Sequence, residues 1–131
     1  MEMAQNSGRM TAKDAQQLER LCRELDAICP DEKPTLIHGD LWSGNVMVND
    51  DGFPVVVDPA VCFAHREMDL AMADLFGGFS MTFYQAYEMT FPLETGFEQR
   101  KSIYQLYYLL VHVNLFGGSY ISSVRNILKP F

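Results

Sequence analysis

The sequence predicts an α+β fold that is mainly helical, and two patterns predict it. Apolar residues recur at helical spacing between Thr11 and Ile28, and again through most of the chain after Glu67. Between these regions, two short valine-rich runs flank an Asn-Asp-Asp-Gly sequence at 49–52, which is typical of a hairpin turn. With 131 residues, 48% of them hydrophobic, the chain has the length and composition of one folded domain.

The expected helices carry recognisable start and stop signals. Thr11 is the expected N-cap of the first helix, with Asp14 as the acidic partner of a capping box. Cys22 falls on the apolar face of this helix, so we expect it to be buried. The two Phe-Gly-Gly sequences are interpreted as helix ends, because neither follows a strand as a phosphate loop would. The helices are expected at residues 11–28, 67–76, 81–89, 97–116 and 120–128, and the fourth is apolar on almost every face, as a buried helix would be.

Three short strands are expected at residues 35–37, 46–48 and 54–57. The second and third form a hairpin, which places Asn45 at the start of one strand and Asp58 at the end of its partner. Antiparallel pairing brings those two ends together. Asn45 and Asp58 are therefore expected to be neighbours although they are far apart in the sequence.

Composition excludes several classes of protein. Ten basic and seventeen acidic residues give a net charge of −7, which disfavours a nucleic-acid partner. The three cysteines show no spacing typical of a disulfide framework or a zinc site. No stretch has the apolar length of a signal peptide or a membrane span, so we expect a cytoplasmic protein without a membrane partner.

An aspartate followed after four residues by an asparagine is the spacing of a phosphoryl-transfer loop. Asp40 is the candidate catalytic base, and Asn45 is a candidate ligand for Mg²⁺ and the nucleotide phosphates. Asp58, after a valine run, is the candidate second metal ligand. The alternatives are a turn-capping role for Asp40 and Asn45 and a strand-end role for Asp58. A carboxylate-based hydrolase would need more clustered acids than this chain offers.

Three further residues are expected to support the site. His38 is expected to orient the loop and not to act as a second base. Asp69, in the first turn of a helix, can reach back and accept hydrogen bonds from the loop, although the helix dipole alone could explain an acid there. Trp42 is expected either in the core or as a wall of a substrate pocket.

These segments closely resemble the fructosamine kinases, also called ketosamine 3-kinases, which are aminoglycoside phosphotransferase-like enzymes with a protein-kinase-like fold. The resemblance covers nearly the whole chain from about Thr11. It is carried by residues 38–45, 58–60, 66–72 and 75–79, and extended by residues 83–87, 98–101 and 114–118. It implies the C-terminal lobe of such a fold, with a small hairpin carrying the catalytic loop and metal ligands. It implies ATP and Mg²⁺ as cofactors, Asp40 as the catalytic base and Asn45 with Asp58 as metal ligands. The implied reaction is phosphorylation of the 3-hydroxyl of a sugar–amine adduct, which begins protein deglycation.

The chain departs from the family in its N-terminal part. Members of the family carry a β-sheet lobe with a loop over the ATP phosphates and a strand-borne lysine, and no such pattern precedes His38. We therefore expect a flexible leader at 1–10 and a kinase-like C-terminal lobe at 11–131, without the ATP-binding lobe. Such a chain is expected to show little activity alone and to associate as a homodimer or domain-swapped oligomer. The alternative is a non-catalytic remnant that serves as a binding or oligomerisation module.

Overall fold

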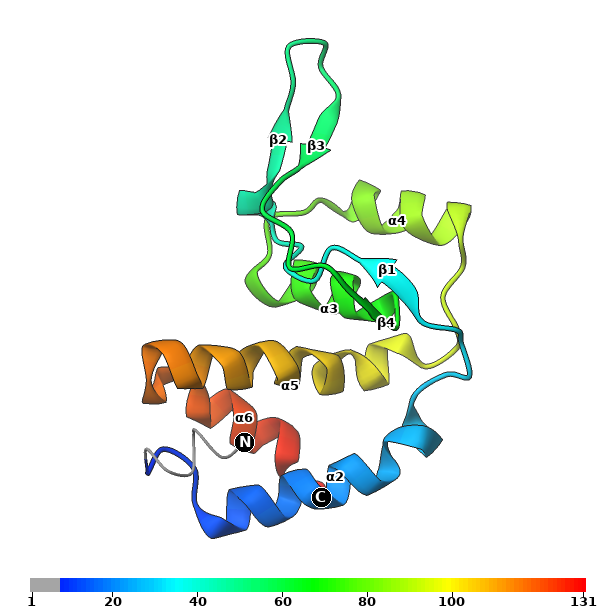
Figure 1. Cartoon of the computed structure of the whole chain (residues 1–131). Helices are drawn as coiled ribbons and strands as arrows, with labels where there is room; N and C mark the ends of the chain where they lie inside the picture. Colours follow the sequence, from blue (N-terminus) through cyan, green and yellow to red (C-terminus); the bar gives the residue numbers. More distant parts are fainter. Residues whose placement is uncertain (1–7) are drawn as a thin grey trace. The chain divides into compact units, whose positions relative to one another are not determined.

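A computed structural model describes residues 8–131 of the chain (Figure 1). The chain forms two compact units, where its length predicts one domain. The first unit joins the N-terminal residues up to Pro30 to Gln105–Phe131, and the second is Asp31–Tyr104. Helix α5 (Phe97–Phe116) contributes residues to both units. All six candidate site residues belong to the second unit.

The first unit packs helix α2 (Ala12–Ile28) against helix α6 (Ile121–Leu128). The predicted capping box is confirmed, because the Thr11 hydroxyl accepts from the Asp14 N–H and the Asp14 carboxylate accepts from the Thr11 N–H. Asp14 also pairs with Arg125 at 2.9 Å, and this hydrogen bond holds the pKa of Asp14 at about 2. One carboxylate therefore caps α2 and joins it to α6.

The predicted leader falls partly outside the described residues, which begin at Gly8. Met10 is buried, with 4% of its surface exposed. The Arg9 guanidinium donates to the carbonyl oxygens of Val113 and Asn114 at 2.7 and 2.8 Å. Residues 9 and 10 are thus attached to the first unit.

The prediction that Cys22 is buried is wrong, since its side chain is exposed. The buried positions of α2 are Asp14, Leu18 and Leu21, together with Ala15. Cys22 directly follows Leu21, and a step of one residue turns the side chain by about 100° around the helix. The apolar face of the helix was predicted correctly, but Cys22 lies just outside it.

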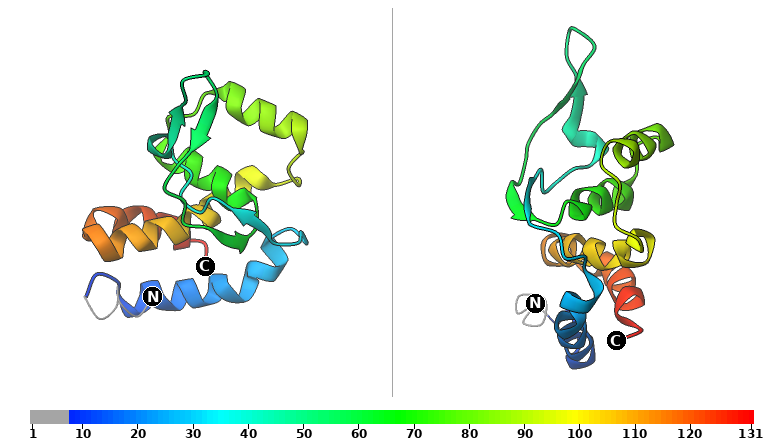
Figure 2. Two further views of the ribbon diagram at one scale, coloured as in Figure 1. Left: turned by 45° about the horizontal axis from the view of Figure 1, so that its top comes forward. Right: turned by 90° about the vertical axis from the view of Figure 1, so that its right-hand side faces the viewer.

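The second unit contains two antiparallel strand pairs. The predicted hairpin is confirmed as β2 (Val46–Val48) and β3 (Pro54–Val56), and it projects from the rest of this unit (Figure 1 and Figure 2). The predicted strand β1 (Thr35–Ile37) pairs with β4 (Cys62–Ala64). Strand β4 was not predicted from the sequence, because it is only three residues long and shows no alternation of apolar and polar residues.

The helices of the second unit come after its strands in the sequence and lie close to their predicted positions. Helix α3 (Glu67–Phe76) ends at Gly77, which has a positive φ of 68°, as expected for the first Phe-Gly-Gly sequence. Helix α4 (Met81–Thr90) is one residue longer than predicted. In the first unit, a short 3-10 turn, η2 (Gly118–Tyr120), replaces the predicted start of the last helix.

Helix α5 has the predicted bounds, but it is not buried on every side. Its buried residues are Arg100, Tyr104, Leu106, Tyr108, Leu109 and Val113. Near its end Leu115 and Phe116 are exposed by 67% and 68%. Within residues 8–131, no helix has the length and apolar character needed to cross a bilayer.

Candidate functional site

The loop that follows β1 is attached to helix α3 by Asp69. The Asp69 carboxylate accepts the backbone N–H of His38 at 2.7 Å and that of Gly39 at 2.8 Å, one with each oxygen. Hydrogen bonds to an ionised acceptor are short and strong, so this pair fixes the start of the loop. Asp69 thus makes the contact with the loop that the sequence suggested, from the first turn of α3.

His38 links the loop to the segment that follows β3 and carries Asp58. Its Nδ1 accepts the Asp40 N–H at 3.3 Å, so the proton of the neutral ring lies on Nε2, which donates to the Val57 carbonyl oxygen at 3.0 Å. Both ring nitrogens therefore form hydrogen bonds with backbone groups. This arrangement suits an orienting residue and not a base.

Asp40 and Asn45 are in direct contact. The Asn45 amide nitrogen donates to the backbone oxygen of Asp40 and to its Oδ2, both at 3.0 Å. Asn45 is buried and ends the 3-10 turn η1 (Ser43–Asn45). With its nitrogen directed at Asp40, the amide oxygen Oδ1 of Asn45 is the atom that can bind a metal ion.

Asp58 is held near Asn45 by the hairpin. The Val57 N–H donates to the Asn45 carbonyl oxygen at 2.9 Å, and the Ala60 N–H donates to the His38 carbonyl oxygen at 2.9 Å. Asp58 lies between these two cross-links and has a φ of 51°, the one positive value at a non-glycine residue in the described chain. Such a conformation costs free energy and is often found at functional positions.

Two glycines of the loop are required by close contacts. Gly39 has a φ of 80°, and a Cβ there would lie 2.0 Å from the Ala60 carbonyl oxygen. A Cβ on Gly44 would lie 2.2 Å from the Trp42 ring. The Trp42 ring therefore lies against Gly44, and it is 40% exposed, which places it at the surface and outside the core.

Sequence reasoning missed the contact between the loop and the segment that joins α3 to α4. A Cβ on Gly78 would lie 2.1 Å from the Ser43 Oγ, so this glycine lets the loop approach closely. The Phe-Gly-Gly sequence was interpreted only as a helix end. The second glycine was the available signal, because Gly77 alone ends the helix.

The oxygen ligands at this site suit a metal ion that prefers oxygen and takes few ligands from the protein. Within residues 8–131, no group of three or more His, Cys, Asp or Glu side chains is arranged to hold a metal ion. Asn45 and Asp58 offer two oxygen ligands. Mg²⁺ commonly takes one or two protein ligands and completes its octahedron with water and phosphate oxygens. The residues present therefore fit Mg²⁺ with a nucleotide and do not fit a zinc centre.

Comparison with known proteins gives a consistent result. The model of the family described as "Fructosamine kinase" matches residues 1–131. A probable ketoamine kinase of Enterococcus faecium is 57% identical over 98 residues, which are 75% of this chain and 35% of that protein. The ketosamine-3-kinase of Mus musculus is 45% identical over 109 residues, which are 83% of this chain and 33% of that protein.

A solved structure of a candidate fructosamine-3-kinase from Thermobifida fusca is 41% identical to this chain, with a TM-score of 0.89. The match covers 98% of this chain and 45% of that one. The mainly helical α+β fold is therefore shared with that structure. The chain spans about a third of the length of the curated relatives described above.

Proposed function

Because the chain belongs to the fructosamine kinase family, we propose that it forms the C-terminal lobe of an ATP-dependent kinase acting on the 3-hydroxyl of a ketosamine. The names of the relatives support a kinase that uses ATP as phosphate donor. The observation that carries the proposal is the grouping of Asp40, Asn45 and Asp58. Asn45 bonds to Asp40 with its side chain, and its backbone carbonyl oxygen accepts the N–H of Val57, next to Asp58.

In this proposal Asp40 orients the acceptor hydroxyl and takes its proton. The Asn45 amide occupies Oδ2 of Asp40, which leaves Oδ1 as the oxygen that accepts the substrate hydroxyl. His38 and Asp69 act as positioning residues, because they accept three backbone N–H groups of the loop, and His38 also ties the loop to the Val57 carbonyl oxygen. A fixed loop matters because phosphoryl transfer depends mainly on positioning and charge neutralisation.

Asn45 and Asp58 are the residues that would hold Mg²⁺. The ion would neutralise negative charge on the phosphates as the phosphoryl group leaves ATP. The Asn45 oxygen is available for this role because its nitrogen faces Asp40. The Asp58 backbone is fixed between two cross-links, one of which joins the neighbouring Val57 to Asn45.

The test is phosphate transfer from Mg²⁺-ATP to a ribulosamine, followed by ³¹P NMR. The chain is assayed alone and with the N-terminal part of the Enterococcus faecium relative added in trans. We expect weak transfer alone and stronger transfer in the mixture. Asp40→Asn should lower transfer by at least about 100-fold, the usual contribution of a catalytic base.

The matched control is Asp50→Asn, which makes the same chemical change at an exposed position of the hairpin turn. It should leave transfer unchanged. Absence of transfer under every condition, with the protein folded, would contradict the kinase proposal and favour a binding module.

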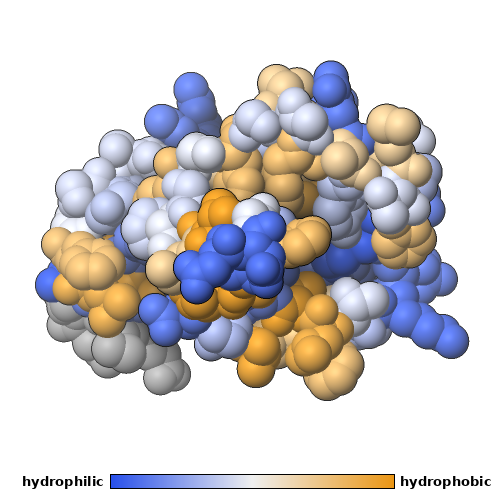
Figure 3. Space-filling model, turned by 90° about the horizontal axis from the view of Figure 1, so that it is seen from above, coloured by the Kyte–Doolittle hydropathy of each residue, from blue (hydrophilic) through white to orange (hydrophobic). Residues whose placement is uncertain are grey.

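That second function is favoured by exposed apolar residues on the strands. Leu36 and Phe63 face each other across β1 and β4 and are 63% and 74% exposed. In the hairpin, Met47 and Val55 are also paired and exposed. Figure 3, seen from above, shows hydrophobic residues at the surface next to hydrophilic ones. Uncovered apolar pairs of this kind favour association.

We propose that this surface supports a homodimer or a domain-swapped oligomer. Sedimentation velocity at increasing concentration should show association, which Leu36→Lys with Phe63→Lys should weaken. A monomer at high micromolar concentration would contradict this part of the proposal.

A further inference from the structure

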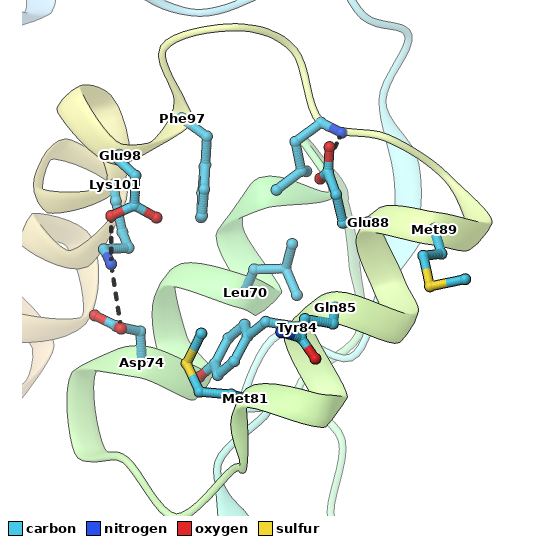
Figure 4. A pocket seen from close by; sticks show the side chains of 11 residues that line it. Leu70, Asp74, Met81, Tyr84, Gln85, Glu88, Met89, Phe97, Glu98 and Lys101 are labelled. Carbon is cyan, nitrogen blue, oxygen red and sulfur yellow. Dashed lines mark hydrogen bonds and ion pairs between the residues drawn. The ribbon is translucent and has the colours of Figure 1, made fainter.

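A pocket of about 660 Å³ lies within the second unit, between α3, α4 and the first turns of α5 (Figure 4). Its volume is in the range of small-molecule sites. Asp40, Asn45 and Asp58 are not among the residues that line it. We propose that this pocket binds an organic ammonium ion carried on an apolar chain or ring, independently of the phosphoryl-transfer site.

The interior of the pocket is apolar. Leu70 of α3 forms part of its wall and is only 2% exposed, while Phe97 and Tyr84 are half-buried beside it. Burial raises the pKa of the Tyr84 phenol, and the negative charge of Asp74 raises it further. The phenol is therefore neutral at physiological pH. Aromatic faces next to an apolar wall suit both a hydrocarbon chain and the cation that it carries.

The charged residues stand on two sides of this interior. Glu88 lies on one side, where it accepts the Leu93 N–H at 3.0 Å, and Asp74 and Glu98 lie on the other (Figure 4). Among the described residues that line the pocket, Lys101 is the one cation, and it pairs with Asp74 at 3.2 Å and with Glu98 at 3.0 Å. Three carboxylates and one ammonium group leave the pocket net negative. It therefore favours a cationic ligand over a neutral or anionic one.

Two arginines hold the far wall of the pocket in place. Arg66 donates to the carbonyl oxygens of Phe91 and Pro92 at 2.8 and 2.6 Å, and its guanidinium lies 3.9 Å from the centre of the Phe91 ring. Arg100 donates to the carbonyl oxygens of Glu94 and Thr95, both at 2.7 Å.

Each arginine is in turn bound by a carboxylate, Arg66 by Glu32 and Arg100 by the fully buried Glu67. The segment 91–95, which includes the lining residue Leu93, is thus fixed from both ends. A wall that is already ordered loses little conformational entropy when a ligand binds.

The same charges argue against a second copy of this chain as the occupant. The chain carries a net charge of −7, so another copy would bring like charge to a negative pocket. A basic, apolar amine brings the complementary charge.

The test uses three probes that share a phenyl ring on a chain of four carbons: phenylbutylamine, phenylbutanol and phenylbutyrate. Each is titrated into the ¹⁵N-labelled chain and followed by ¹H–¹⁵N NMR. We expect the amine to bind with a Kd of the order of 1 mM, a value consistent with about eleven non-hydrogen atoms. Shifts should be confined to residues 70–101. The alcohol should bind more weakly, and the carboxylate more weakly still.

Glu88→Gln with Glu98→Gln removes two of the lining charges and keeps the acceptor for the Leu93 N–H. This double variant should weaken amine binding by about fivefold, in line with exposed charge pairs, and leave alcohol binding unchanged. The control is Glu24→Gln with Asp51→Asn, which changes the net charge equally at exposed positions outside the pocket.

If a variant fails to fold, the comparison of the three probes on the parent chain still tests the proposal. Equal binding of the amine and the alcohol, tighter binding of the carboxylate, or no saturable shifts at the lining residues would overturn the proposal. Equal weakening in the pocket variant and in the control would also overturn it, because the effect would then come from net charge.

Discussion

The loop at residues 38–45 and the turn at residues 49–52 both connect strands of the same unit, but they are held differently. The turn is held by Asn49, whose side-chain oxygen accepts the N–H groups of Asp51 and Phe53. The loop is held by Asp69, which lies 31 residues beyond His38. The turn therefore depends on its own sequence, whereas the loop depends on helix α3 and on strand contacts. A site of this kind can be disturbed by changes far from it in the sequence.

The largest expected effect comes from two glycines with the same backbone conformation. Gly39 and Gly52 have φ values of 80° and 84°, but a Cβ meets the Ala60 oxygen at 2.0 Å in the loop and nothing within 4 Å in the turn. Gly52→Ala should therefore cost only the left-handed penalty, about 1 kcal/mol. Gly39→Ala adds a clash with backbone and should cost about 3–4 kcal/mol.

Urea unfolding of both variants measures this difference. Equal costs at the two positions would show that the contact between Gly39 and Ala60 is not tight, and the close approach of the loop to residues 58–60 would be wrong.

The next effect concerns the acceptor of the loop N–H groups. Asp69→Ala leaves the N–H groups of His38 and Gly39 without their partner, at about 1–3 kcal/mol for each part-buried group. Phosphate transfer should fall as well, because the loop is no longer held. We expect Asp69→Asn to recover part of the stability, since its amide oxygen can still accept one N–H. If Asp69→Ala and the parent have the same urea concentration at the midpoint of unfolding, the loop is held by other contacts.

A smaller effect, in the first unit, depends on pH. The hydrogen bond from Arg125 lowers the pKa of Asp14 from 3.8 to about 2. Because the folded-state pKa is the lower one, the stabilisation is complete above the unfolded value and is lost as the pH falls from 3.8 towards 2. We expect about 1–2 kcal/mol, reduced because the Arg125 side chain is half exposed.

The measurement is the free energy of unfolding of the parent and of Asp14→Asn across this range. The parent should lose stability more steeply than the variant. Parallel curves would mean that Asp14 and Arg125 do not interact in solution.

The smallest effect is expected at the turn itself. Asn49→Ala removes two exposed hydrogen bonds and should cost about 1 kcal/mol or less. Because the turn does not support the loop, phosphate transfer should not change. A large loss of transfer in this variant would show that the hairpin tip and the loop are coupled.

The sequence predicted those parts of the fold that have local signals. The capping box of α2, the hairpin turn and the glycine end of α3 each depend on residues close together in the chain. Strand β4 was missed because it is defined by pairing with β1, and Phe63 meets Leu36 only in the folded chain. The burial of Cys22 was mispredicted because the edge of an apolar stripe depends on the neighbouring helix.

The candidate site shows the same division. Asp40 and Asn45 could be found from their spacing, and the hairpin brought Asp58 into the same region. The positive φ of Asp58 had no sequence signal. The close contacts of Gly39 and Gly78 had none beyond the glycines themselves. Such contacts join segments that lie far apart in the chain, and spacing alone does not predict them.

The most direct test is where a divalent ion binds in the presence of ATP. Mn²⁺ replaces Mg²⁺ and broadens the ¹H–¹⁵N signals of nearby residues. The account predicts broadening at residues 44–46 and 57–59, abolished by Asp58→Ala and unchanged by Asp50→Asn. Broadening centred on the acidic turn at residues 50–51, or broadening that survives in Asp58→Ala, would contradict the assignment of Asn45 and Asp58 as metal ligands.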